Sequence, residues 1–189
     1  MDQHLEANRR LWDAWTPFHV ASAFYDVDGF KAGRKELGPI ELAGVGDVRG
    51  RSLLHLQCHF GLDTLAWAGR GAIVTGVDFS EPAIVAARAL AAELGIDARF
   101  VVSDVYALPD RLAGEYDIVF TSHGVLSWLP DLAGWARVVA RFLKPGGAFF
   151  VVDTHPFAYV FDDERTDSEL RVRYPYFPRP EPLREEKTG

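Results

Sequence analysis

Five short apolar runs alternate with amphipathic segments through the middle of this sequence, and that alternation constrains the fold most. The runs are residues 52–56, 72–77, 98–102, 116–121 and 148–153. Most hold consecutive β-branched or aromatic residues, which is typical of strands buried on both faces. Strands separated by helical crossovers pair in parallel with right-handed connections. The sequence therefore predicts an α/β fold with a doubly wound, mainly parallel sheet and helices on both faces.

Helix signals fill the intervals between these runs. Ser80, Pro82 and Gly95 frame an alanine-rich segment as an N-cap, a first-turn proline and a terminating glycine. Asp131 is the expected N-cap of another helix, which the KPGG segment at residues 144–147 ends. Residues 3–15 predict a further amphipathic helix. In a sheet of this kind ligands bind beyond the carboxyl ends of the strands, so the loops there are the candidate site.

The charge balance limits the partners to be expected. The chain has 20 Lys and Arg against 27 Asp and Glu, a net charge of −7. Because an acidic chain has no general attraction for phosphate backbones or anionic lipid, we expect neither nucleic acid nor a membrane as a partner. The single cysteine, Cys58, excludes an internal disulfide and a zinc site built on several cysteines, and no metal site is predicted. Since residues 1–10 carry no signal-peptide core, we expect a cytoplasmic protein.

Acidic residues follow two of the predicted strands at the ligand-binding edge. Asp78 ends the second strand, where a carboxylate can accept hydrogen bonds from two hydroxyls of an adenosine ribose. Asp104 follows the third strand, where a carboxylate can accept from the amino group of adenine. The alternatives are that Asp78 only caps the following helix and that Asp104 is a solvated loop residue. The sequence favours an adenosine site.

With these residues in place, the chain resembles class I S-adenosylmethionine-dependent methyltransferases over about residues 50–153. The family's motifs occur in order at residues 53–61, 76–80 (GVDFS), 103–109 (SDVYALP) and 143–147 (LKPGG). The resemblance implies S-adenosylmethionine as cofactor, a small-molecule acceptor and the strand order 3-2-1-4-5. It implies a cofactor site formed by Gln57, His59, Phe60, Gly61, Asp63, Asp78, Phe79, Ser80, Asp104, Val105, Thr121 and Ser122.

The glycine-rich turn departs from the family's pattern. That pattern has an acidic residue, an apolar residue and then three glycines at alternate positions. Here His55 stands at the acidic position, and Gln57, His59 and Gly61 stand at the glycine positions. Glycine is used there because the backbone approaches the ligand and can need a positive φ. We therefore expect Gln57 and His59 to alter the path of the turn or to contact the ligand through their side chains. Asp63 is the candidate to replace the missing carboxylate.

Histidines and aromatic residues complete the predicted site. Methyl transfer from a sulfonium depends mainly on in-line positioning, because the leaving group is neutral. A hydroxyl or amine acceptor can also need a base. The candidate catalytic bases are His123 and His155, and the alternative for each is a loop histidine that bonds to the backbone. The candidate lid and substrate residues are Trp12, Trp15, His19, Tyr25 and Trp128, for which core packing is the alternative.

The sequence also predicts how the chain is divided. Residues 1–49 are expected to form a helical lid, 50–155 the cofactor-binding core, and 156–189 a charged, proline-rich, partly extended tail. The family's sheet continues past its fifth strand, but the strands expected there are missing from this tail. The fifth strand would then be an apolar edge, and we expect the tail, a second copy in a homodimer, or further residues to cover it. Two other functions stay open, a nicotinamide-dependent oxidoreductase and a non-catalytic binding protein that retains the fold.

Overall fold

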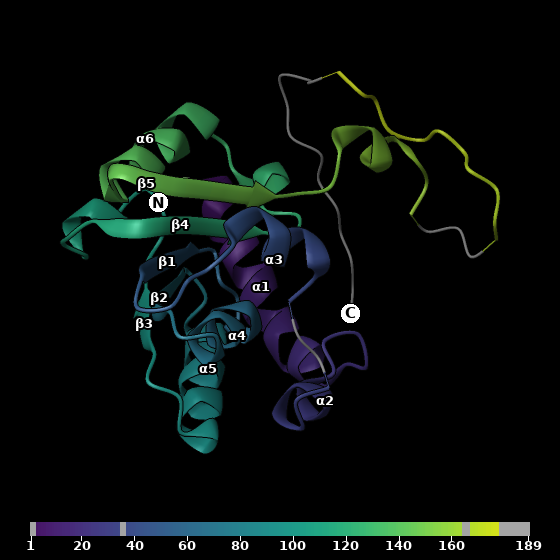
Figure 1. Cartoon of the computed structure of the whole chain (residues 1–189). Helices are drawn as coiled ribbons and strands as arrows, with labels where there is room; N and C mark the ends of the chain where they lie inside the picture. Colours follow the sequence, from purple (N-terminus) through teal and green to yellow (C-terminus); the bar gives the residue numbers. More distant parts are fainter. Residues whose placement is uncertain (1–2, 35–36, 164–166, 178–189) are drawn as a thin grey trace. The chain divides into compact units, whose positions relative to one another are not determined.

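The computed structural model describes residues 3–34, 37–163 and 167–177 (Figure 1). The chain forms two compact units, Met1–Val152 and the segment from Asp153 onwards. The N-terminal helices and the sheet therefore belong to one unit. Residues 178–189 of the predicted tail lie outside the described residues.

The first unit contains a five-stranded sheet in the order β3-β2-β1-β4-β5. Every neighbouring pair of strands is parallel. The strands are β1 (Ser52–Leu56), β2 (Ile73–Asp78), β3 (Arg99–Val102), β4 (Tyr116–Ser122) and β5 (Leu143–Val152). This topology confirms the predicted fold and strand order. It brings the carboxyl ends of β1, β2, β3 and β4 to one edge of the sheet.

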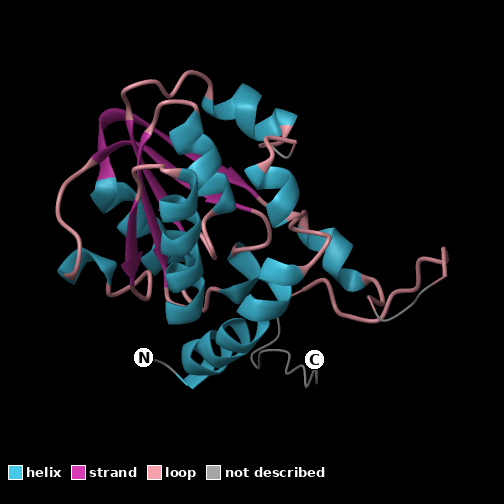
Figure 2. Ribbon diagram, turned by 90° about the horizontal axis from the view of Figure 1, so that it is seen from below, coloured by secondary structure: helices cyan, strands magenta, loops and turns pink. Residues whose placement is uncertain are grey.

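Helices cover both faces of the sheet, as Figure 2 shows. Because side chains alternate along a strand, β1 serves two cores. Leu54 and Leu56 pack with residues of α6 (Leu132–Phe142), whereas Leu53 packs on the other face with Trp67 of α4 (Leu62–Gly69). The third core lies between α4 and α5 (Glu81–Leu94). The cores fix the strand ends that carry the site.

The predicted caps of α5 and α6 are confirmed. Ser80 accepts a hydrogen bond from the backbone N–H of Ala83, and Gly95 ends α5 in the left-handed conformation. Asp131 caps α6 by accepting from the backbone N–H of Gly134. These ends were predictable because each capping bond spans only three residues.

Two element boundaries differ from the prediction. α1 (Gln3–Ala21) continues six residues beyond Trp15, with Pro17 inside it. Its last turns are held by ring contacts of Trp12 and Trp15 with His19, and such packing outweighs the proline's missing N–H. β5 begins at Leu143 rather than Ala148, because Leu143 already pairs with Tyr116 before a break in register. Short helices α2 (Val27–Lys31) and α3 (Pro39–Val45) follow α1.

β5 is an edge strand of the sheet, as expected. Phe149 and Val151 on this strand are 39% and 38% exposed, so the edge is apolar. What covers it, including the predicted homodimer, stays a prediction. In the second unit, Pro156–Val160 form a 3₁₀ turn, and Phe161 makes one antiparallel bridge with Val172.

Candidate active site

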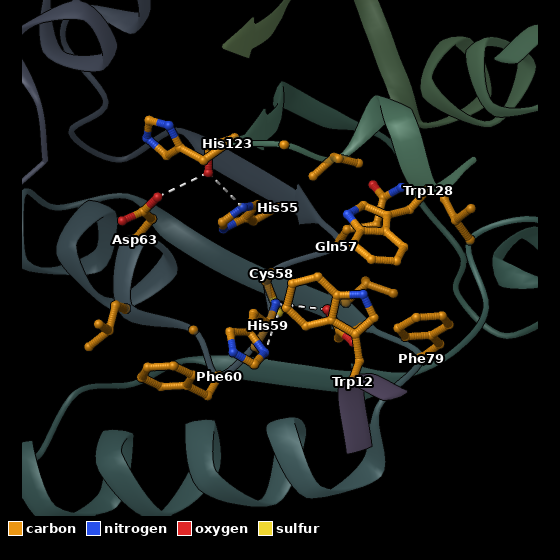
Figure 3. Close-up of a pocket in the computed structure, with 18 of the residues that line it drawn as sticks. Trp12, His55, Gln57, Cys58, His59, Phe60, Asp63, Phe79, His123 and Trp128 are labelled. Atoms are coloured by element: carbon orange, nitrogen blue, oxygen red, sulfur yellow. Dashed lines mark hydrogen bonds between the residues drawn. The ribbon is translucent and has the colours of Figure 1, made fainter. Parts of the chain in front are cut away.

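A cavity of about 360 Å³ lies at the carboxyl ends of the strands (Figure 3), near the lower end of the range for ligand pockets, roughly 300–1,000 Å³. Most of the residues predicted from the sequence line it. They are Trp12, Tyr25, Gln57, His59, Phe60, Gly61, Asp63, Asp78, Phe79, Asp104, Val105, Ser122, His123 and Trp128.

Four predicted site residues of the first unit do not line this cavity. Ser80 is fully buried as the N-cap of α5, and the Thr121 hydroxyl donates to the Leu56 carbonyl. Trp15 makes ring contacts with His19 and with Trp128. His155 belongs to the second unit, where it accepts from the backbone N–H of Phe157 and caps a 3₁₀ turn, and its role as a base stays a prediction.

The turn after β1 has glycine-like φ angles at all three of the family's glycine positions, although only Gly61 is a glycine. φ is +53° at Gln57, +52° at His59 and +80° at Gly61. A non-glycine residue in this left-handed region costs about 1–2 kcal/mol. The His59 backbone N–H donates to Asp78 Oδ2 at 2.8 Å, and that bond to the end of β2 helps to hold the strained turn.

Asp78 and Asp104 both stand at or just after the end of a strand, and Asp78 is the more buried of the two. The residue is 6% exposed, and its carboxylate accepts a second hydrogen bond, from the Ser80 backbone N–H to Oδ1 at 2.9 Å. Burial raises the pKa of Asp78 to about 6, although the backbone donors act in the opposite direction. Each carboxylate oxygen has a further lone pair, so Asp78 can still accept from a ligand.

Three residues of the predicted lid, Trp12, His19 and Trp128, pack together over the turn that follows β1. His19 Nδ1 lies 3.0 Å from His59 Nε2, and the Trp12 ring makes edge contacts with His59 and Trp128. Burial is the main cause that lowers the pKa of His59 to about 3, so this ring is neutral at physiological pH. His59 Nδ1 is buried and has no partner among the described residues. A polar atom of this kind is available to a ligand.

A chain of polar side chains stands at the other end of the cavity. The Ser122 hydroxyl donates to Asp63 Oδ2 at 2.9 Å, and His55 Nε2 lies 3.5 Å from the same hydroxyl. His55 Nδ1 lies 2.8 Å from the Thr64 hydroxyl. Complete burial lowers the pKa of His55 to about 3, so the residue at the family's acidic position is neutral. Asp63 is therefore the acidic residue of this chain of side chains.

Sequence reasoning missed one charged residue of the cavity, Glu41. It lies on α3, is 3% exposed, and accepts from His123 Nε2 at 2.7 Å. Neither its position nor its neighbours carry a motif. A buried carboxylate needs a hydrogen-bond partner. The partner of Glu41 is His123, and in the sequence the strands β1 to β4 lie between the two residues.

The charges of the cavity wall all have one sign. Four carboxylates line it, those of Glu41, Asp63, Asp78 and Asp104. Among the described lining residues there is neither a lysine nor an arginine. Such a wall favours a cationic ligand over an anionic one. No set of three or more His, Cys, Asp or Glu side chains in the described residues is arranged for a metal ion.

Comparison with known proteins identifies the class of this fold and site. Residues 53–147, half of the chain, match the model of the methyltransferase domain family. The chain belongs to that family, whose members are class I S-adenosylmethionine-dependent methyltransferases. Among the described residues, no helix has the length and apolar character to cross a membrane.

Particular relatives agree with this assignment. A ubiquinone biosynthesis O-methyltransferase of Alkalilimnicola ehrlichii is 33% identical over 148 residues, which are 75% of this chain and 60% of that protein. One from Aeromonas salmonicida is 28% identical over 147 residues, 75% of this chain and 61% of that protein. The chain thus spans about 60% of the length of these relatives. The solved structure of a DhpI–SAH complex has the same fold, with a TM-score of 0.59, 24% identity, and coverage of 88% of this chain and 76% of that one.

Proposed function

We propose that this chain transfers a methyl group from S-adenosylmethionine to a small molecule. The observation that carries the proposal is the cavity wall, with four carboxylates and, among the described lining residues, no cationic side chain. S-adenosylmethionine bears a sulfonium and an ammonium, which suit that wall. A nicotinamide dinucleotide carries an anionic pyrophosphate instead, so the wall disfavours the oxidoreductase alternative.

The order of the strands supports an assignment of the parts of the cofactor to residues. Along the carboxyl edge the order is β3, β2, β1 and β4, so Asp104, Asp78, Gln57 and Ser122 follow one another. Asp104 would accept from the adenine amino group and Asp78 from the ribose hydroxyls. Asp63, beside Ser122, would hold the ammonium.

Unpartnered groups in the structure fit this cofactor. His59 Nδ1 and Gln57 Nε2 are buried without partners among the described residues, and both side chains line the cavity. When bound, S-adenosylmethionine supplies an electrophilic methyl group whose bond to sulfur breaks with the electron pair going to sulfur. The chain's own residues would hold and orient it, exclude water through the Trp12 lid, and position the acceptor.

The ligand preference can be tested by thermal unfolding. We expect S-adenosylmethionine at about 100 times its Kd to stabilise the protein by about 2.7 kcal/mol. For a chain of this length that is a rise in Tm of about 5–11 °C. S-adenosylhomocysteine should also stabilise, because it keeps the adenosine and the ammonium. Stabilisation by NAD and not by either adenosyl compound would reverse the proposal.

Cofactor binding should depend on pH through Asp78. Its pKa is raised to about 6, mainly by burial, so the free protein takes up a proton there as the pH falls below that value. The protonated group is a poorer acceptor for ribose hydroxyls. We therefore expect the Kd of S-adenosylhomocysteine to rise by up to about tenfold per pH unit below about pH 6.

Calorimetric titration of the cofactor product between about pH 5 and 8 measures this dependence. Asp78→Asn is the matched variant, since it is isosteric and does not titrate. It should bind weakly with little change across the same range. Equal pH dependence in both proteins would assign the titration to another group.

A further inference from the structure

We propose that Glu41 and His123 form a carboxylate–imidazole pair that removes the proton from a hydroxyl acceptor, with Glu41 as a positioning residue. The inference rests on the proposed function, because it assumes that a methyl group is transferred in this cavity. It adds the chemical class of the acceptor and a role for Glu41.

The geometry of the pair fixes which ring nitrogen of His123 donates to Glu41. Glu41 Oε1 lies 2.7 Å from His123 Nε2, and the Glu41 side chain is only 4% exposed. A carboxylate accepts hydrogen bonds, so Nε2 must carry the proton in this contact. In this contact the neutral form of the ring is the tautomer with its lone pair on Nδ1. Among the described residues no hydrogen bond to Nδ1 is found, and the His123 side chain is 64% exposed, so an acceptor can reach that atom.

The backbone at His123 has a strained conformation, and that conformation sets the direction of the imidazole ring. His123 has a φ of +56° and is followed by Gly124 at +79°. Its backbone N–H donates to the Val152 carbonyl of β5 at 2.8 Å, which anchors the turn. A histidine at positive φ costs about 1–3 kcal/mol, and residues held in such conformations cluster at active sites. The anchored turn thus holds the His123 ring in a position that an unstrained loop would not give it.

The pair stands at the end of the cavity where the methyl group would be transferred. Figure 3 shows His123 and Asp63 at one end, and Trp12 and Phe79 at the other. Ser122, the residue before His123, donates to Asp63. With adenine and ribose at Asp104 and Asp78, the strand order would direct the sulfonium toward the β4 end, which carries His123.

The proton balance gives the acceptor class. As the acceptor oxygen bonds to the methyl carbon, it loses its proton to His123 Nδ1, and the pair of the broken carbon–sulfur bond stays on the thioether. The ring becomes an imidazolium whose charge Glu41 balances, and solvent removes the proton afterwards. A hydroxyl needs this base because it is a weak nucleophile while protonated. An unprotonated amine or a thioether does not.

The first test reads the ring itself and requires no turnover. In protein with ¹⁵N-labelled histidine, long-range proton–nitrogen spectra should show His123 with a protonated Nε2 and an unprotonated Nδ1. His123→Asn, which tolerates a positive φ, identifies the resonances. Replacing the carboxylate by Glu41→Leu should leave a mixture of tautomers. A wild-type ring with its proton on Nδ1 overturns the pair, whatever the protein methylates.

The second test is a double-mutant cycle of methyl transfer, with catechol as the hydroxyl acceptor and aniline as the amine acceptor. We expect His123→Asn to lower kcat by about 10²- to 10⁴-fold, and Glu41→Gln by on the order of 10- to 100-fold. The Kd for S-adenosylhomocysteine should stay the same in both. Glu41→Gln should have no further effect in His123→Asn, because Glu41 acts through His123. Added imidazole should restore part of the activity of His123→Asn.

The outcomes separate the two proposals. Glu93→Gln, an exposed residue of α5 that pairs with Lys31, is the control and should leave kcat unchanged. If the fall in kcat of the double variant equals the product of the two single falls, Glu41 acts independently of His123 and has only a structural role. Cofactor binding with methylation of aniline alone, or of neither probe, would overturn the acceptor class. A protein that binds neither adenosyl compound contradicts the proposed function instead.

Discussion

Asp78→Ala is expected to weaken the binding of S-adenosylhomocysteine by at least 10- to 100-fold. Hydrogen bonds to a charged group are worth about 1.5–3 kcal/mol, and every 1.4 kcal/mol is a factor of ten in Kd. Asp78 also accepts from the backbone N–H groups of His59 and Ser80. Its removal therefore frees the strained turn at the same time as it deletes the ribose contact.

Calorimetry can measure this loss, and two variants divide it into its parts. Asp78→Asn keeps an acceptor oxygen for the turn but removes the charge, so it should lose less affinity than Asp78→Ala. Asp97→Ala, at an exposed site between α5 and β3, should bind like the wild type. Circular dichroism shows whether each variant is folded. Unchanged affinity in folded Asp78→Ala would remove Asp78 from the proposed cofactor site.

The parts of the fold that follow from local chemistry were predictable from the sequence. Ser80 and Asp131 cap helices through bonds that span three residues. Short runs of consecutive apolar residues, nearly all buried, mark β1, β2 and β4. Asp78 stands at the end of a strand, where its motif places it. The start of β5 was not predictable, because Leu143 pairs with Tyr116, 27 residues earlier in the chain, across a break in register.

The site itself was predictable only in part, because long-range contacts complete it. His19 meets His59 across 40 residues of sequence, and Glu41 meets His123 across a longer interval. No spacing rule links such pairs. The turn after β1 is an intermediate case. The missing glycines marked Gln57 as unusual, but only the structure shows that it keeps the positive φ.

Gly61→Ala is expected to destabilise the protein by about 2–5 kcal/mol, far more than the same change at Gly95. Gly61 has a φ of +80°, which costs an alanine about 1–2 kcal/mol. A Cβ there would also lie 2.8 Å from the Phe100 ring and 3.1 Å from Ala87 Cβ. Phe100 is 5% exposed, so its ring has little room to move, and overpacking of a core adds about 1–3 kcal/mol.

Gly95→Ala is the matched control, since it separates the conformational cost from the crowding. Gly95 also has a positive φ, +64°, but a Cβ there would meet nothing within 4 Å. It should lose only about 1–2 kcal/mol. Thermal unfolding without cofactor should then place Gly61→Ala about 2–12 °C below Gly95→Ala, since each kcal/mol shifts Tm by about 2–4 °C. Equal losses would mean that the turn moves away from Phe100 freely, so that the last glycine is kept for its φ alone. A larger loss at Gly61 would mean that its hydrogen side chain is what lets the turn pack on α5 and β3, beneath the proposed cofactor site.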